Sequence, residues 1–194
     1  MPEGPSPAPS AALTAWLAAP ADPQRIAALA SASRLAPIPA ATLDRIPAQG
    51  LHALMHADGV RFADLRPAVR AAVLVTGLGP RLGIVPDVAE RRDLDHMPFV
   101  VHTDGDCIVA DINGSSERRS GFGQPFYHQW AGGVEAPALI VDCHRLEHVN
   151  SVLIAWMLQV AQSAKPTRLK VHRARLQVVT QLKQLRLDHL MVIE

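Results

Sequence analysis

The chain has 194 residues, of which 48% are hydrophobic, and its 19 Lys and Arg side chains nearly balance 18 Asp and Glu side chains. This apolar content is ample for a buried core and excludes a chain that is disordered throughout. Neither half carries the excess positive charge that nucleic-acid binding normally requires, so we expect no nucleic-acid partner.

The cysteines and the apolar segments indicate the cellular compartment. Cys107 and Cys143 form neither a CxxC pair nor a disulfide framework, which is typical of a reducing environment. The first residues lack the basic and apolar regions of a signal peptide, and no segment reaches the roughly 18 apolar residues of a membrane span. We therefore expect a cytoplasmic protein with no membrane insertion.

The first half of the chain predicts a tail and a helical domain. Residues 1–10 are rich in Pro and Ala, which favours a disordered tail. Residues 11–95 show helical spacing of apolar side chains interrupted by prolines, which predicts a mainly α-helical domain. A domain of this kind could sense a signal, dimerise or dock.

Four helices and a linker are expected within this domain. Three of the helices are predicted over 11–19, 23–35 and 40–55, the last interrupted by a proline. Asp64 is a candidate N-cap for a further helix with Pro67 in its first turn. The charged residues 86–95 are turn-like and predict a linker.

The periodicity changes from helical to alternating near residue 96. Residues 99–102 and 107–112 alternate in the manner of strands, and the segment 103–106, Thr-Asp-Gly-Asp, between them predicts a hairpin turn. Residues 115–135 contain several glycines and aromatic side chains and predict no regular element. The rest of the chain predicts, in order, a strand at 138–142, a helix at 151–163, a strand at 168–172, a helix at 174–187 and a strand at 190–193.

This order of strands and helices predicts an α/β domain over residues 96–194, with helices over a mostly parallel sheet. Its most distinctive segment is 139–151, Leu-Ile-Val-Asp-Cys-His-Arg-Leu-Glu-His-Val-Asn-Ser, which runs from an apolar strand ending in Asp through a short loop to a helix start. The close of the chain, Leu187-Asp188-His189-Leu190, and the short motif Ile112-Asn113-Gly114 are further landmarks.

These segments resemble the STAS domain, the fold shared by sulfate-transporter tails and anti-sigma factor antagonists. The resemblance covers about residues 97–194, half of the chain. It implies a STAS-like mixed sheet with helices packed on it, and a non-enzymatic module that binds a partner protein. The chain departs from the family in three respects. Asn150 stands where Asp is most frequent, Val152 and Leu153 replace small residues and Gly, and residues 115–135 do not resemble a regular first helix.

Two interpretations of the helix start are open. Asn150 or Ser151 can cap the helix by accepting hydrogen bonds from its free N–H groups. The resemblance instead implies that a partner kinase phosphorylates Ser151, and a helix N-terminus is a favourable place for a phosphate. The implied partner-binding residues are Asn150, Ser151, Val152, Ile154, Ala155 and Leu158.

The helix that follows is apolar on more than one side. Val149, Val152, Leu153, Trp156 and Val160 fall on one face and suffice for a core contact, whereas Ile154 and Leu158 lie off that stripe. An exposed apolar patch of this kind marks a contact site. The alternative is a helix buried on both sides, under residues 115–135 or under the N-terminal half.

Other sequence patterns indicate ligand-binding sites only weakly. Cys143, His144 and His148, and separately His52, His56 and Asp58, supply too few converging groups for zinc, so we expect no metal. The glycine-rich turn at 77–83 has the spacing G-x-G-x-x-x-G and is followed by Pro86, which argues against a dinucleotide loop. The basic run 165–175 is interpreted as a solvated face. We expect no cofactor and no enzymatic activity.

The sequence thus predicts a regulatory protein-interaction module that resembles an anti-sigma factor antagonist. The resemblance implies a kinase-type anti-sigma factor as the partner protein, and a homo-oligomer is left open. One alternative is a constitutive scaffold or adaptor subunit of a larger complex, such as a stress-signalling assembly or a lipid-transport ATPase. A further alternative is an enzyme or cofactor-binding protein that uses the turn at 77–83.

Overall fold

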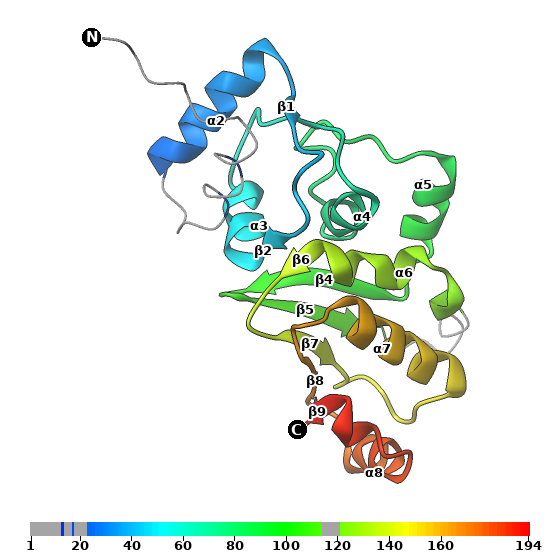
Figure 1. The fold of residues 1–194 in the computed structure, drawn as a ribbon. Helices are drawn as coiled ribbons and strands as arrows, with labels where there is room; N and C mark the ends of the chain where they lie inside the picture. The colour runs from blue at the N-terminus through cyan, green and yellow to red at the C-terminus, as the bar shows by residue number, and fades with distance from the viewer. Residues whose placement is uncertain (1–12, 14–16, 18–22, 114–120) are drawn as a thin grey trace.

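The computed structural model describes residues 13, 17, 23–113 and 121–194. Its architecture is mixed α/β, with a five-stranded mixed sheet in the C-terminal half and short helices and strands in the N-terminal half (Figure 1). The predicted tail over 1–10 and most of the predicted helix over 11–19 lie outside the described residues. Among the helices of the described residues, none has the length and apolar character needed to cross a membrane.

The large sheet has the strand order β4-β5-β7-β8-β9. Its strands are β4 (Phe99–Asp104), β5 (Cys107–Ile112), β7 (Leu139–Asp142), β8 (Leu169–His172) and β9 (Met191–Ile193). The first two form an antiparallel hairpin, whose turn contains Gly105 at a positive φ of 60°. All the other pairings are parallel. The predicted strands and the predominantly parallel sheet are confirmed.

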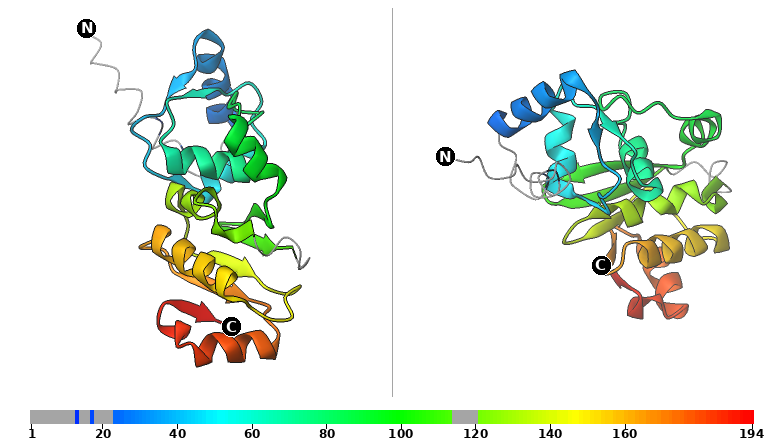
Figure 2. Two further views of the ribbon diagram at one scale, coloured as in Figure 1. Left: turned by 90° about the vertical axis from the view of Figure 1, so that its right-hand side faces the viewer. Right: turned by 45° about the horizontal axis from the view of Figure 1, so that its top comes forward.

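The helices of this half include α6 (Phe126–Gln129), α7 (Ser151–Ser163) and α8 (Leu176–Gln184), and the 3-10 helices η2 (Trp130–Gly133) and η3 (Leu187–His189). The chain steps along the sheet in one direction from β5 to β9. Because right-handed crossovers are nearly universal, all of these helices lie on the same face of the sheet. The side view in Figure 2 shows them on one side of the strands.

Burial alternates along the strands accordingly. The side chains that face the helices are buried, among them Val101, Ala110, Val141 and Val171. On the other face Val100 is 52% exposed, Ile140 and Lys170 are half-buried and His172 is exposed. Within the described residues the sheet therefore has one covered face and one largely open face.

The N-terminal half contains more short elements than predicted. They are α2 (Pro23–Leu35), β1 (Ile38–Pro39), β2 (Ile46–Pro47), α3 (Ala48–Met55), β3 (Phe62–Ala63), α4 (Pro67–Val75) and α5 (Val88–Asp95). The predicted helix over 23–35 is confirmed. Strands β1 and β3 pair in parallel, and β2 pairs in parallel with β6 (Val134–Glu135) from the other half.

Two predicted helix starts were wrong. The helix expected over 40–55 begins only at Ala48, because the residues before it form a turn and the strand β2. Asp64 does not cap α4; it has a left-handed φ of 56°, and Arg66 occupies the N-cap position before Pro67.

The prediction of a turn-like linker over 86–95 was also wrong. Asp87 and Glu90 form a capping box, in which Asp87 Oδ1 accepts from Glu90 N at 2.8 Å and Glu90 Oε2 accepts from Asp87 N at 2.9 Å. This box starts α5. Arg70 of α4 donates two hydrogen bonds to Glu90, at 2.7 and 2.8 Å, and these lower the pKa of that carboxyl despite its partial burial. The local charges therefore stabilise a helix rather than a flexible joint.

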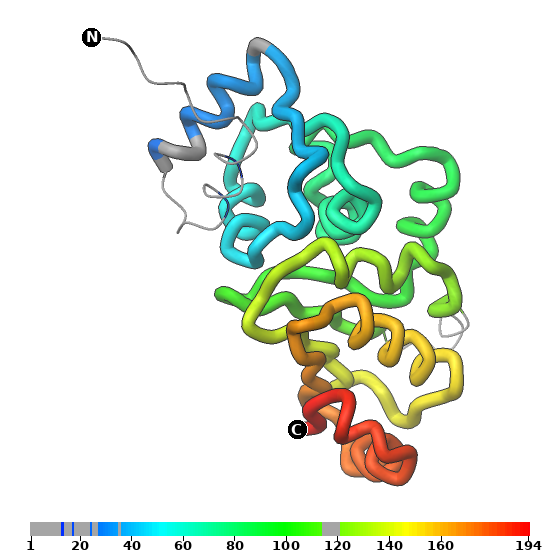
Figure 3. Tube along the Cα trace, viewed as in Figure 1, coloured from blue at the N-terminus to red at the C-terminus, as the bar shows by residue number. Residues whose placement is uncertain are grey.

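The two halves of the chain meet over an extensive contact (Figure 3). One continuous hydrophobic cluster includes buried side chains from Leu13 to Met191. Helix α4 packs against η2 so closely that a Cβ on Gly133 would lie 2.2 Å from Ala68 O. The predicted domain boundary falls between α5 and β4, and division into two domains stays a prediction.

The sequence predicted no regular element over residues 115–135, of which 115–120 lie outside the described residues. Residues 121–135 build the centre of the core. The carbonyl oxygen of Tyr127 accepts two indole N–H groups, from Trp130 at 2.8 Å and from Trp156 at 2.7 Å. The ring of Phe99 lies 4.9 Å from that of Trp156 and 5.8 Å from that of Tyr127. This cluster fixes α7 against the segment that joins the two halves.

The contact at Gly133 generates a stability prediction. A Gly133→Ala variant places a methyl group against the backbone of Ala68. Because backbone atoms cannot move aside as a flexible side chain can, the free energy of unfolding should fall by about 1–3 kcal/mol. Urea denaturation measures this change. Gly123→Ala is the matched control, because its added methyl meets nothing within 4 Å; equal effects of the two substitutions would contradict the close contact.

Candidate functional site

The carboxyl ends of the parallel strands carry most of the predicted site residues. Strands β5, β7 and β8 are in register there, so that Asp111 lies beside Asp142 and Asp142 lies beside His172. Helices α7 and α8 begin just beyond the same edge. In open α/β sheets this edge is the usual location of binding sites.

Asn150 is the N-cap of α7. It has extended backbone angles, its Oδ1 accepts a hydrogen bond from Leu153 N at 2.8 Å, and its carbonyl oxygen accepts one from Ile154 N at 3.0 Å. The capping interpretation therefore holds for Asn150. Ser151 is the first residue of the helix and is exposed, and its hydroxyl is not needed for the cap. Phosphorylation of Ser151 stays a prediction.

The predicted partner-binding residues differ in exposure. Ser151 and Ala155 are exposed, whereas Val152, Ile154 and Leu158 are half-buried and pack against the core. Of the side chains predicted to face the core, Leu153, Trp156 and Val160 are buried and Val149 and Val152 are half-buried, and Met157, which was not predicted, is buried as well. Both α6 and η2 contact α7, so residues 121–135 cover one flank of the helix and leave the stripe around Ser151 and Ala155 accessible.

The loop between β7 and α7 is held in place at three points. Leu146 and Cys143 are fully buried, and burial raises the pKa of the Cys143 thiol to about 12. The backbone N–H of Val149 donates to Oε1 of Gln181 on α8 at 3.1 Å. The start of α7 is therefore fixed relative to both the sheet and α8.

An apolar side chain that the sequence did not single out lies on α8. Leu176, in the first turn of that helix, is 82% exposed, whereas Val178 and Leu182, which helical spacing places on one face, are buried. The sequence did contain a signal for this exposure, because Leu176 lies away from the helix face that carries Val178 and Leu182. Because α7 and α8 both follow parallel strands, Leu176 and Ser151 lie at the same edge of the sheet.

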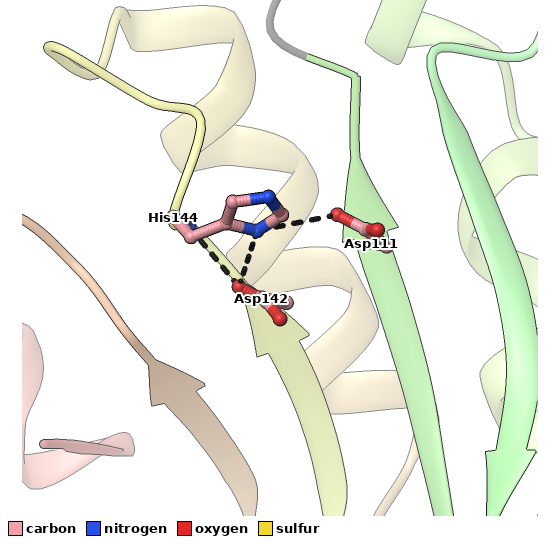
Figure 4. A group of neighbouring side chains, drawn as sticks. All are labelled: Asp111, Asp142 and His144. Atoms are coloured by element: carbon pink, nitrogen blue, oxygen red, sulfur yellow. Dashed lines mark hydrogen bonds and ion pairs between the residues drawn. The ribbon is translucent and has the colours of Figure 1, made fainter.

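A polar cluster that sequence analysis missed lies on the open face at this edge (Figure 4). His144 Nδ1 is 3.0 Å from Asp142 Oδ1 and 3.7 Å from Asp111 Oδ1, and the N–H of His144 donates to Asp142 Oδ1 at 3.0 Å. Arg173 Nε donates to the other oxygen, Asp142 Oδ2, at 2.9 Å, and Nη2 also contacts it. The signal in the sequence was an Asp near the end of each of two successive predicted strands.

The carboxyl of Asp142 is buried, with a side chain only 5% exposed. Burial alone would raise its pKa, but the hydrogen bonds from Arg173 and from the backbone and ring of His144 outweigh this cost and lower the pKa below its usual value. The carboxylate of Asp111, in contrast, is not fully hydrogen-bonded. Its Oδ1 is buried and has no hydrogen-bond partner among the described residues.

The other predicted clusters acquire structural explanations. Helix α4 ends at Val75, and the turn after it contains Gly77 and Gly83 at positive φ angles of 75° and 69°. This geometry fits a helix terminus followed by a tight turn. The rings of His52 and His56 lie edge to face at 5.2 Å, and His52 Nδ1 lies 3.3 Å from Thr103 Oγ1 on β4.

A cavity of about 910 Å³ lies at the opposite, amino end of the strands. Its lining mixes basic and acidic side chains, including Arg45, Arg168, Lys170, Asp106 and Glu135. None of the predicted site residues lines it, and Arg45 is already engaged by the carbonyl oxygens of Ala164 and Lys165.

Comparison with known proteins finds no family model, no curated protein and no solved structure that matches this chain.

The cap at Asn150 generates a prediction about helix stability. Asn150→Ala removes the acceptor for Leu153 N and should lower the free energy of unfolding by about 1 kcal/mol in a urea titration. Asn150→Asp is the matched control, because it keeps the acceptor and places a negative charge at a helix N-terminus, and should retain that stability. A loss of equal size in both variants would contradict the role of the cap.

Proposed function

We propose that this protein is a non-enzymatic regulatory module that docks a partner protein at the start of α7. The docking surface comprises Asn150, Ser151, Val152, Ile154, Ala155 and Leu158. The observation that carries the proposal is the position of Ser151, an exposed hydroxyl in the first turn of a helix, beside exposed Ala155 and the half-buried apolar side chain of Val152. A partner can bury this apolar stripe while contacting the hydroxyl.

Phosphorylation of Ser151 provides the switch in this proposal. The first turn of a helix presents free N–H groups and partial positive charge, which accommodate a phosphate in the unbound protein. The phosphate brings about −1.5 to −2 charge into a surface that a partner must desolvate. Docking of the apolar stripe and phosphorylation are therefore opposed, as a switch requires.

The STAS resemblance supports a specific kind of partner. The order of a hairpin, a strand, α7, β8, α8 and β9 is the order that the sequence predicted for the segments that resemble that family. In that case the partner is a kinase-type anti-sigma factor that consumes ATP. The N-terminal half, which packs on η2, then supplies an input to the docking module.

A constitutive scaffold is the second candidate, and Asn150 and Val152 favour it. Asn150 provides a neutral cap where the STAS family most often has Asp, and Val152 is half-buried beside Ser151 where the family has a small residue. A bulky neighbour restricts the approach of a kinase to the hydroxyl. On this account the same surface binds its partner without modification.

The two candidates separate in a binding experiment. Wild-type protein, Ser151→Ala and Ser151→Asp are used to capture partners from the native host, and the bound protein is identified and its affinity measured. The switch predicts that Ser151→Ala retains the partner and that Ser151→Asp weakens binding at least about tenfold, a loss of about 1.4 kcal/mol. Intact-mass measurement should then show a phosphorylated fraction of the wild-type chain.

Two further results decide between the candidates. Val88→Asp is a matched control, because Val88 is 89% exposed on α5, away from the docking surface, and it should bind like wild type. Equal binding by Ser151→Ala and Ser151→Asp, in a stoichiometric complex with unmodified Ser151, would reject the switch and favour the scaffold. Failure of all four proteins to capture a common partner would contradict docking itself.

A further inference from the structure

We propose that Asp111, Asp142 and His144 form a binding site for one divalent transition-metal ion, for which Zn²⁺ is the fitting probe. The three side chains come from β5, from β7 and from the loop that follows β7 (Figure 4). One potential ligand atom from each lies within 4.8 Å of the others. The proposal does not depend on the docking function.

The geometry is close to that of a coordinated ion. Zinc bonds to nitrogen and carboxylate oxygen are about 2.0–2.2 Å long, so ligand atoms around a tetrahedral ion lie about 3.4 Å apart. In this structure the separations of His144 Nδ1 from the two carboxylate oxygens, 3.0 and 3.7 Å, lie on either side of that value. Movements of a few tenths of an ångström would suffice for binding.

The oxygen left without a partner is the independent sign of a ligand. Asp111 Oδ1 is buried, has no hydrogen-bond partner among the described residues and faces His144 Nδ1. Leaving a buried charged oxygen unpaired is costly. Arg173 pairs with Asp142, whereas no arginine or lysine of the described residues forms an ion pair with Asp111, which favours a cation beside Asp111.

The present contacts allow metal entry. Arg173 engages Oδ2 of Asp142, whereas the ion would bind Oδ1, so this ion pair can persist as an outer support for the carboxylate. His144 Nε2 accepts from Arg145 Nε at 3.1 Å, which assigns the ring proton to Nδ1. Metal binding at Nδ1 therefore requires the single ring proton to move, through solvent, from Nδ1 to Nε2 with no net proton release, and Arg145 turns away from the newly protonated Nε2.

The donor set determines the class of ion. One imidazole nitrogen and two carboxylate oxygens suit Zn²⁺ and its neighbours in the first transition series better than Mg²⁺, which prefers oxygen ligands alone. Cys143 does not contribute, because its thiol is buried and its pKa is raised to about 12. Water completes the coordination, since three protein ligands leave a position open.

The site would have a structural consequence for the docking surface. His144 begins the loop that leads to the cap at Asn150, and a bound ion would join this loop to β5 and β7. The expected effect is a more rigid connection between the sheet edge and the start of α7.

Isothermal titration of the full chain with Zn²⁺, with Mg²⁺ as the comparison ion, tests the site. One Zn²⁺ should bind per chain, with a rise in melting temperature, and Mg²⁺ should bind at least tenfold more weakly. Asp111→Asn and His144→Gln should each lower Zn²⁺ affinity at least tenfold and abolish the rise. Both target side chains are partly exposed, so the variants should fold; circular dichroism checks this.

His148→Gln is the matched control, because it removes an exposed imidazole from the same loop and should leave Zn²⁺ affinity unchanged. Substitution with Co²⁺ adds a spectroscopic check: visible absorption bands of a tetrahedral ion should appear in the wild-type protein and disappear in His144→Gln. The proposal is overturned if Zn²⁺ does not bind, or if binding survives both Asp111→Asn and His144→Gln.

Discussion

The carbonyl oxygen of Tyr127 accepts hydrogen bonds from two indole rings that come from different parts of the chain. Trp130 lies three residues after Tyr127, at the start of η2, and Trp156 lies in the middle of α7. Both N–H groups are buried, and each would be costly to leave unsatisfied. This shared acceptor therefore fixes the position of α7 relative to η2, and η2 in turn packs against α4 through the close contact at Gly133.

This arrangement accounts for the accessible part of α7. The side of the helix that carries Trp156 packs within the aromatic cluster. The loop before the helix is held by buried Leu146 and by the hydrogen bond from Val149 N to Gln181. Only the stripe that starts at Ser151 is left for a partner within the described part of the chain. The helix start is thus rigid and exposed at once, which lowers the entropic cost of binding.

The C-terminal half was predictable because its signals are local. Alternating apolar residues gave the strands, and Asn before an apolar run gave the start of α7 at Ser151. Three features depend on contacts between distant residues and left no local pattern: the pairing of β2 with β6, the aromatic cluster around Tyr127, and the meeting of Asp111 with His144. The helix α5 was missed although its capping box, Asp87 and Glu90, was visible in the sequence.

The central claim is that the start of α7 is a protein-docking surface. The most direct test is hydrogen–deuterium exchange of the full chain, measured free and bound to its captured partner. The account predicts that partner binding slows exchange in peptides covering 150–158, with smaller changes at the first turn of α8 near Leu176. Unchanged exchange over 150–158, with protection instead on the open face of the sheet at β4 or β8, would contradict it.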